Sequence, residues 1–256
     1  MFEYPLELDL RTAPEHFERV YIDNSILSET KPKKMSWGRV CGFSDLLGKA
    51  DSFHDLSSRI LYQQEKKSKE LAKIISQSNY YSTDEIIAEY ECFINHIERN
   101  ISWLRGNSRR GNKQELLENI LHNYKITRNK LLRVPSNQRV QDFLQRKRLH
   151  LPRVRELTKI TNSISIDCSE ADASLVSAAI CFQGSSAILT HDMDICNLVY
   201  NAGLDLREQD LTHSAVVYFL RPEHYKFNFD FSADANRTYA QTRNSIPLEN
   251  ISSTTT

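Results

Sequence analysis

Residues 187–194 read Ala-Ile-Leu-Thr-His-Asp-Met-Asp, an apolar run that stops at two carboxylates one residue apart. Such a run predicts a buried strand that delivers acidic side chains to the edge of a sheet. On its own the pair Asp192 and Asp194 is a weak signal, because two nearby acids more often decorate a solvated turn or cap the next helix.

A second segment of the same design lies far upstream. Residues 19–25 read Arg-Val-Tyr-Ile-Asp-Asn-Ser, again a short β-branched run that ends in an acid, Asp23. Ligands of open α/β sheets bind outside the carboxyl ends of the strands, so two such strands in one parallel sheet would place these acids together. The two segments therefore predict an acidic site at one edge of a parallel sheet.

Strands and helices alternate along much of the chain. The hydrophobic pattern predicts strands near residues 20–23, 79–83, 164–167, 187–190 and 215–220, and helices near residues 43–76, 84–97, 113–133, 137–148, 169–182 and 192–201. This alternation predicts a three-layer α/β/α sandwich with a central parallel sheet. We expect one domain over residues 1–231, with helical insertions at about 30–78 and 99–160, and a polar, disordered tail over 232–256.

The composition is typical of a water-soluble protein. Charged residues make up 26% of the 256 residues, the mean hydropathy is −0.51, and no apolar run approaches the ~20 residues that a membrane helix needs. The first nine residues carry three acids and no basic residue, unlike a secretory signal. We therefore expect a cytoplasmic protein with no membrane partner, and its five cysteines, which form no CxxC pair, are expected to be reduced.

Further acids accompany the two strand ends. Glu85 and Glu89 lie one turn apart on the helix after the second strand, and Asp172 lies in the first turn of the helix at 169–182. A helix N-terminus tolerates acids through its dipole, which explains Asp172 individually. Three or more converging carboxylates repel one another unless they are protonated or bound to a cation, so such a cluster is typical of a hard-metal site.

The order of these motifs resembles that of the PIN-domain nucleases. The matching pieces are the strand ending at Asp23, Thr83-x-x-Ile86-x-x-Glu89, Glu170-Ala171-Asp172-x-x-Leu175-x-x-Ala178-Ala179 and Ile188-Leu189-Thr190-x-Asp192-x-Asp194. The resemblance covers roughly residues 18–220 and is most specific over residues 165–200. It implies a catalytic, metal-binding quartet with Asp194 as a supporting fifth metal ligand. The quartet is Asp23, Glu89, Asp172 and Asp192.

The resemblance also implies a chemistry. One or two Mg²⁺ or Mn²⁺ ions held by the carboxylates would promote hydrolysis of a phosphodiester bond, with RNA favoured over DNA. Asn24 and Thr190 are expected to contact the substrate or the waters of the metal, and Ser25 is expected to cap a helix. The spacings from Asp23 to Thr83 and from Glu89 to Asp172 are longer than in compact members of the family, and Glu85 competes with Glu89 for the second position.

Positive charge is concentrated in residues 99–159. This basic block carries 16 Lys and Arg against 4 Asp and Glu, a net charge of +12, whereas the rest of the chain is net −12. Such a block predicts contacts to the phosphates of a nucleic acid, and its alternative is a solvated helical face. The arginines expected to bind the substrate are Arg109, Arg110, Arg146 and Arg148.

Other classes of function remain open. One alternative is a catalytically silent PIN-like module that binds nucleic acid or a protein, including an antitoxin partner. A less favoured one is a metal-dependent nucleotide-sugar transferase, which would use Asp192 and Asp194 but leave Asp23 and Asp172 without roles. A haloacid-dehalogenase-like phosphatase requires Asp-x-Asp at the first strand, and Asp23-Asn24-Ser25 lacks the second acid. The helical stretch at 43–76 is a candidate face for a homodimer.

Overall fold

The computed structural model describes residues 8–28, 33–34, 40–41, 58–105, 111–146, 150–156, 159–165, 169–192, 195, 198–199 and 215–219. Its helices are α1 (Ala13–His16), α2 (Asn24–Leu27), α4 (Ser58–Gln77), α5 (Asp84–Arg105), α6 (Gly111–Lys130), α7 (Gln138–Arg146) and α8 (Glu170–Ile180). Its strands are β1 (Arg19–Ile22), β2 (Lys33–Lys34), β3 (Val40–Cys41), β4 (Tyr81–Thr83), β5 (Leu132–Val134), β6 (His150–Glu156), β7 (Lys159–Ser165), β8 (Ser186–Thr190) and β9 (Ala215–Phe219).

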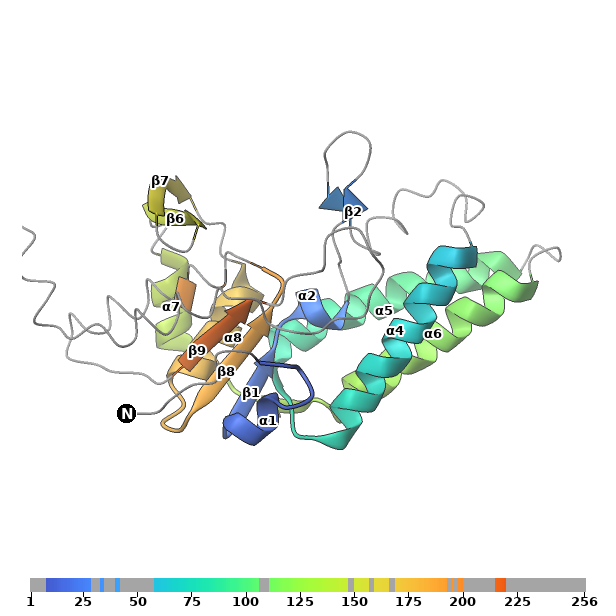
Figure 1. Cartoon of the computed structure of the whole chain (residues 1–256), viewed down its shortest axis with the longest axis horizontal. Helices are drawn as coiled ribbons and strands as arrows, with labels where there is room; N and C mark the ends of the chain where they lie inside the picture. Colours follow the sequence, from blue (N-terminus) through green and yellow to red (C-terminus); the bar gives the residue numbers. More distant parts are fainter. Residues whose placement is uncertain are drawn as a thin grey trace, which may run out of the picture.

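Five strands form a parallel sheet in the order β5-β4-β1-β8-β9, with helices on both sides (Figure 1). Along the chain, β1, β4 and β5 are added one after another toward one edge of the sheet. The later strands β8 and β9 are then added on the other side of β1, toward the opposite edge. The strand order therefore reverses between β1 and β8, where Tyr21 is in register with Ile188. This is the position at which open α/β sheets bind their ligands.

The central strands are apolar because both of their faces are covered. Val20, Tyr21 and Ile22 of β1 are fully buried, and every residue of β8 is buried. Strands buried on both faces read as continuous hydrophobic runs rather than as alternating ones. The predictions of strands at 20–23, 79–83, 187–190 and 215–220 are thereby confirmed within a residue or two.

Three long helices lie beside one another to one side of the sheet (Figure 1). We call α4, α5 and α6 the helical arm. The arm joins both of the insertions expected from the sequence, because α4 packs along α6 although the two are separated by a strand and a helix. The apolar face of α4 is buried in this packing, with Leu61 and Leu71 in the same hydrophobic cluster as the central strands.

Two parts of the chain differ from the pattern predicted by the sequence. Residues 132–134 form the edge strand β5, although the helix was expected to run to residue 133, because pairing with β4 replaces the helical hydrogen bonds. Residues 164–165 belong to β7, which pairs antiparallel with β6 in a separate hairpin and not with the parallel sheet. Both differences come from strand partners that a local pattern does not contain.

Several predictions fall on residues outside the description. These are the helix over 43–57, most of the helix at 192–201, and the tail at 232–256; Ile195, Leu198 and Val199 are helical and buried. Within the described ranges, no helix is both long enough and apolar enough to cross a bilayer.

Candidate active site

Four acids predicted from the sequence lie at or near the carboxyl edge of the parallel sheet. Asp23 directly follows β1, and Asp192 comes two residues after β8 ends. Asp172 is the third residue of α8, and Glu89 lies in the second turn of α5. Since β1 and β8 are neighbours, this fold places the acids of both strands where the strand order reverses.

Asp23 is buried, with 4% of its surface exposed. Its carboxylate oxygen Oδ2 accepts hydrogen bonds from two hydroxyl groups, one from Ser25 and one from Thr190 at 2.7 Å. Its backbone N–H donates to the carbonyl oxygen of Leu189 at 3.1 Å, which extends the pairing of β1 and β8 by one residue. The acid is therefore held by the sheet through its backbone and by two hydroxyls through its side chain.

The surroundings of Asp23 disfavour its charge. Burial raises the pKa of Asp23 from its ordinary value of 3.8 to about 7. The hydrogen bonds from Ser25 and Thr190 lower this pKa, whereas the charges of Asp172 and Asp192 raise it further. Asp172 and Asp192 are thus close enough to Asp23 to repel its negative charge.

Glu89 joins the same acidic site. The amide nitrogen Nδ2 of Asn24 donates to Glu89 Oε2 at 3.2 Å, which links the start of α2 to α5. Burial raises the pKa of Glu89, the hydrogen bond from Asn24 lowers it, and the charge of Asp172 raises it. Among the described contacts this link is made by Glu89 and not by Glu85.

Asp172 also has a structural role. Its carboxylate accepts a hydrogen bond from the backbone N–H of Ser169 at 3.1 Å, and the Ser169 hydroxyl accepts from the backbone N–H of Asp172 at 3.0 Å. This reciprocal arrangement is a capping box that starts α8. Deeper in the molecule, the hydroxyls of Thr83 and Ser174 lie 2.6 Å apart and connect the end of β4 to α8. The end of β4, after which α5 begins, is therefore tied to α8, the helix that carries Asp172.

Hydroxyl groups organise the turn after β8. The Thr190 hydroxyl accepts a hydrogen bond from the backbone N–H of Asp192 at 2.8 Å while it donates to Asp23. The Ser25 hydroxyl accepts from the backbone N–H of His191 at 2.9 Å. Thr190 is fully buried and its proton goes to Asp23, so its placement favours positioning of the acids over contact with a substrate. Asp194 lies outside the described residues.

Sequence reasoning missed the role of Ser25. It was expected to cap a helix, but no side-chain cap is formed at the start of α2, and its hydroxyl instead bridges Asp23 and His191. Ser25 and Asp23 are two residues apart, but only the pairing of β1 with β8 brings Ser25 to His191, so no local signal reveals that second contact. The capping box of Ser169 and Asp172, in contrast, can be predicted from the sequence, because its two residues follow the spacing Ser-x-x-Asp.

The donors at this site suit a hard divalent cation. Carboxylate oxygens are the preferred ligands of Mg²⁺ and Mn²⁺, and Asn24 adds an amide oxygen, Oδ1, that is buried and has no hydrogen-bond partner within the protein. Across the described ranges, no three Asp, Glu, His or Cys side chains converge closely enough to hold a metal ion by themselves. The acids influence one another by charge, and waters of the ion would complete its coordination.

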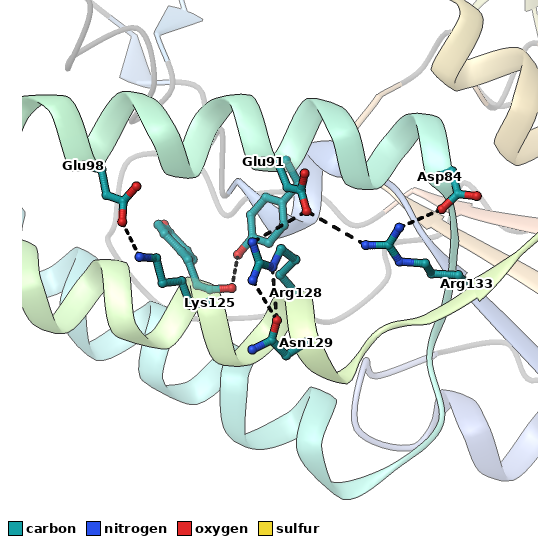
Figure 2. A network of polar contacts seen from close by, with 9 residues as sticks. Asp84, Glu91, Glu98, Lys125, Arg128, Asn129 and Arg133 are labelled. Carbon is teal, nitrogen blue, oxygen red and sulfur yellow. Dashed lines mark hydrogen bonds and ion pairs between the residues drawn. The ribbon is translucent and has the colours of Figure 1, made fainter.

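The basic block is partly neutralised by acids that precede it. Lys125 pairs with Glu98, Arg128 with Glu91 and Arg133 with Asp84 (Figure 2). The N–O distances of the second and third pairs are 3.6 Å and 3.0 Å. These acids belong to α5 and come before residue 99 in the sequence, so the net charge of the block overstates what it offers to a ligand. Of the arginines expected to bind the substrate, Arg109, Arg110 and Arg148 lie outside the described residues, as does the side chain of Arg146.

Two surface grooves lie on the helical arm and not at the acids. One of about 490 Å³ runs between α4 and α6, and one of about 850 Å³ runs between α5 and α6. Neither of these two grooves is lined by a member of the acidic quartet. No protein-family model, curated protein or solved structure matches this chain.

Proposed function

We propose that this protein is a metal-dependent nuclease of the PIN-like kind that hydrolyses phosphodiester bonds, with RNA as its substrate. One observation carries the proposal. The buried carboxylate of Asp23 lies within the electrostatic influence of Asp172 and Asp192, and Asp172 likewise acts on Glu89, at the point where the order of a parallel sheet reverses. A cluster of like charges at a ligand-binding edge is stabilised when a cation neutralises it.

Some residues of the site would hold the metal ions, and others orient those ligands. Asp23, Glu89, Asp172 and Asp192 would hold one or two Mg²⁺ or Mn²⁺ ions. When bound, such an ion activates a water and stabilises the leaving oxygen of the phosphodiester. Ser25 and Thr190 orient Asp23, and the Ser169 backbone orients Asp172, so the acids are held in place before an ion arrives.

The first prediction tests this assignment by removing one charge at a time. Asp23→Asn and Asp192→Asn are expected to reduce the cleavage of a fluorescently labelled RNA under Mn²⁺ by at least about a thousandfold, because each removes a ligand of the ion. Glu89→Gln should be nearly as damaging. Glu85→Gln is the matched control one turn earlier and should retain activity within a fewfold range.

Two results would contradict the assignment. One is wild-type cleavage by Asp23→Asn or Asp192→Asn. The other is a larger loss for Glu85→Gln than for Glu89→Gln, which would move the second acid by one turn of α5. A labelled DNA of the same sequence, run in parallel, decides between RNA and DNA as the substrate.

A second candidate function follows from one observation. Because no three potential ligands converge within the described residues, a PIN-like module that binds nucleic acid or a protein without cleavage is the competing proposal. A Mn²⁺ titration followed by calorimetry separates the two. Binding that requires Asp23 and Asp192 supports the nuclease, whereas RNA binding that is unaffected by Mn²⁺, with no cleavage, supports the silent module.

A further inference from the structure

Asn24 directly follows Asp23, and its side chain contacts Glu89 through one of its two polar atoms. Its Nδ2 donates to Glu89 Oε2 at 3.2 Å, and its Oδ1 is buried without a hydrogen-bond partner within the protein. An ionised carboxylate can only accept hydrogen bonds, so the contact with Glu89 determines which end of the amide faces that acid. A buried carbonyl oxygen without a partner is costly, and such atoms are usually satisfied by water or by an ion.

The carboxylates of Asp23 and Glu89 likewise accept hydrogen bonds at one of their two oxygens. Ser25 and Thr190 both donate to Oδ2 of Asp23, and Asn24 donates to Oε2 of Glu89. Within the part of the chain that the structure describes, the hydrogen bonds to these two acids go to Asp23 Oδ2 and Glu89 Oε2, and none goes to Asp23 Oδ1 or Glu89 Oε1. Asp23, Asn24 and Ser25 are consecutive, so one short turn at the end of β1 orients both carboxylates.

We propose that Asn24 is a positioning residue of the metal site: its amide nitrogen holds Glu89 at the start of α2, and its amide oxygen accepts a hydrogen bond from a water on the bound divalent cation. The proposal rests on the metal centre of the proposed function. Mg²⁺ and Mn²⁺ sites of this kind keep several waters, and each such water is a strong donor. The role is therefore that of an outer partner, which orients a ligand and a water without touching the ion.

The experiment measures Mn²⁺ affinity by calorimetry on the full chain. Asn24→Ala removes both contacts and is expected to weaken Mn²⁺ binding about tenfold, the usual size for loss of an outer partner. Asn112→Ala is the matched control, because Asn112 is an exposed residue in the first turn of α6. It should bind Mn²⁺ as the wild type does.

Asn24→Asp separates the two contacts. The substitution keeps an oxygen for the water but places a carboxylate opposite Glu89, where the amide donor was. Mn²⁺ affinity should then be equal to or higher than that of the wild type, because a negative charge is added near the cation. Turnover at saturating Mn²⁺ should nevertheless fall, since Glu89 is no longer held by a donor.

A double-variant cycle tests whether Asn24 acts through Glu89. If it does, Asn24→Ala should weaken Mn²⁺ binding less in the Glu89→Gln background than in the wild type, because the contact with Glu89 is already altered and only the contact with the water remains to be lost. Independent residues would instead multiply their separate effects. Melting temperatures in EDTA verify that each variant is folded.

The outcomes distinguish this inference from the proposed function. Wild-type Mn²⁺ affinity in Asn24→Ala, or fully multiplicative effects in the cycle, would overturn the role of Asn24 even if the protein is a nuclease. Mn²⁺ binding that depends on Asn24 without any cleavage of RNA or DNA would support the inference and overturn the nuclease. A wild-type chain that binds no Mn²⁺ would overturn both.

Discussion

Asp23 shows how a single residue combines stability and function. Its side chain is buried among other acids, and its pKa of about 7 lies well above the ordinary value of 3.8. The hydroxyls of Ser25 and Thr190 lessen the cost of its charge but do not remove it. The buried charge of Asp23 therefore lowers stability, and under the proposed function a bound cation would offset that loss.

The raised pKa predicts the pH dependence of metal-free stability. Between about pH 4 and pH 7 the folded chain keeps a proton on Asp23 that the unfolded chain releases, so the free energy of unfolding falls as pH rises through this window. The loss is on the order of 4 kcal/mol. In EDTA, Asp23→Asn should therefore be more stable than the wild type at pH 8 and should match it near pH 4.

Urea denaturation at several pH values measures this effect. Glu15→Gln, at an exposed acid of α1, is the control and should follow the wild-type curve. An Asp23→Asn variant that is less stable than the wild type at pH 8 in EDTA would show that the charge of Asp23 is not a burden on the fold.

At the scale of elements, the contact between α5 and α6 has two layers. On the outside, ion pairs such as Arg128 with Glu91 have side chains that are 31% and 40% exposed. Inside, the rings of Tyr90, Phe93 and Tyr124 pack with centroids 5.2 to 6.2 Å apart. Exposed ion pairs contribute little because water screens them, whereas buried aromatic rings contribute through area and geometry.

This contrast predicts unequal losses of stability. Glu91→Gln should lower the free energy of unfolding by less than about 1 kcal/mol, and the loss should disappear at high salt. Tyr124→Ala should cost about 3–5 kcal/mol at any salt concentration, because it leaves a cavity and removes the hydroxyl that accepts from Gln64 at 2.7 Å. Urea denaturation in low and high NaCl tests both; a larger loss for Glu91→Gln would refute this ordering.

At the scale of the whole molecule, the question is which cations are available to a polyanion. Lys125, Arg128 and Arg133 are paired with acids of α5 (Figure 2). A cation already paired within the protein releases few counterions from a nucleic acid. We therefore expect affinity for single-stranded RNA to depend on other members of the basic block, and the four arginines expected from the sequence remain the candidates.

Salt dependence tests this expectation. Replacing Arg109, Arg110, Arg146 and Arg148 by Gln should weaken RNA binding for all sequences and flatten the dependence of log affinity on log salt by about 0.7 per lost phosphate contact. Lys125→Gln with Arg128→Gln is the matched control and should leave that slope unchanged. Fluorescence anisotropy across a NaCl series reports both slopes. An unchanged slope in the quadruple variant would identify the block as a solvated surface.

Much of the fold could be predicted from local patterns. The strands that carry Asp23 and Asp192 are short apolar runs buried on both faces, and the start of α8 follows from its Ser-x-x-Asp cap, so each element contains its own signal. The edge strand β5 and the β6–β7 hairpin contain no such local signal, because their strand character depends on the strands with which they pair.

The sequence by itself determined which acids end which elements, since burial, periodicity and capping act over a few residues. Only the tertiary structure decided that β1 lies beside β8, that Glu89 receives the amide of Asn24, and that Ser25 and Thr190 share one oxygen of Asp23. It also decided that cations of the basic block are paired with α5. Apart from that between Ser25 and Asp23, these contacts join residues far apart in the chain, and their formation depends on the packing of the whole core, which no local pattern encodes.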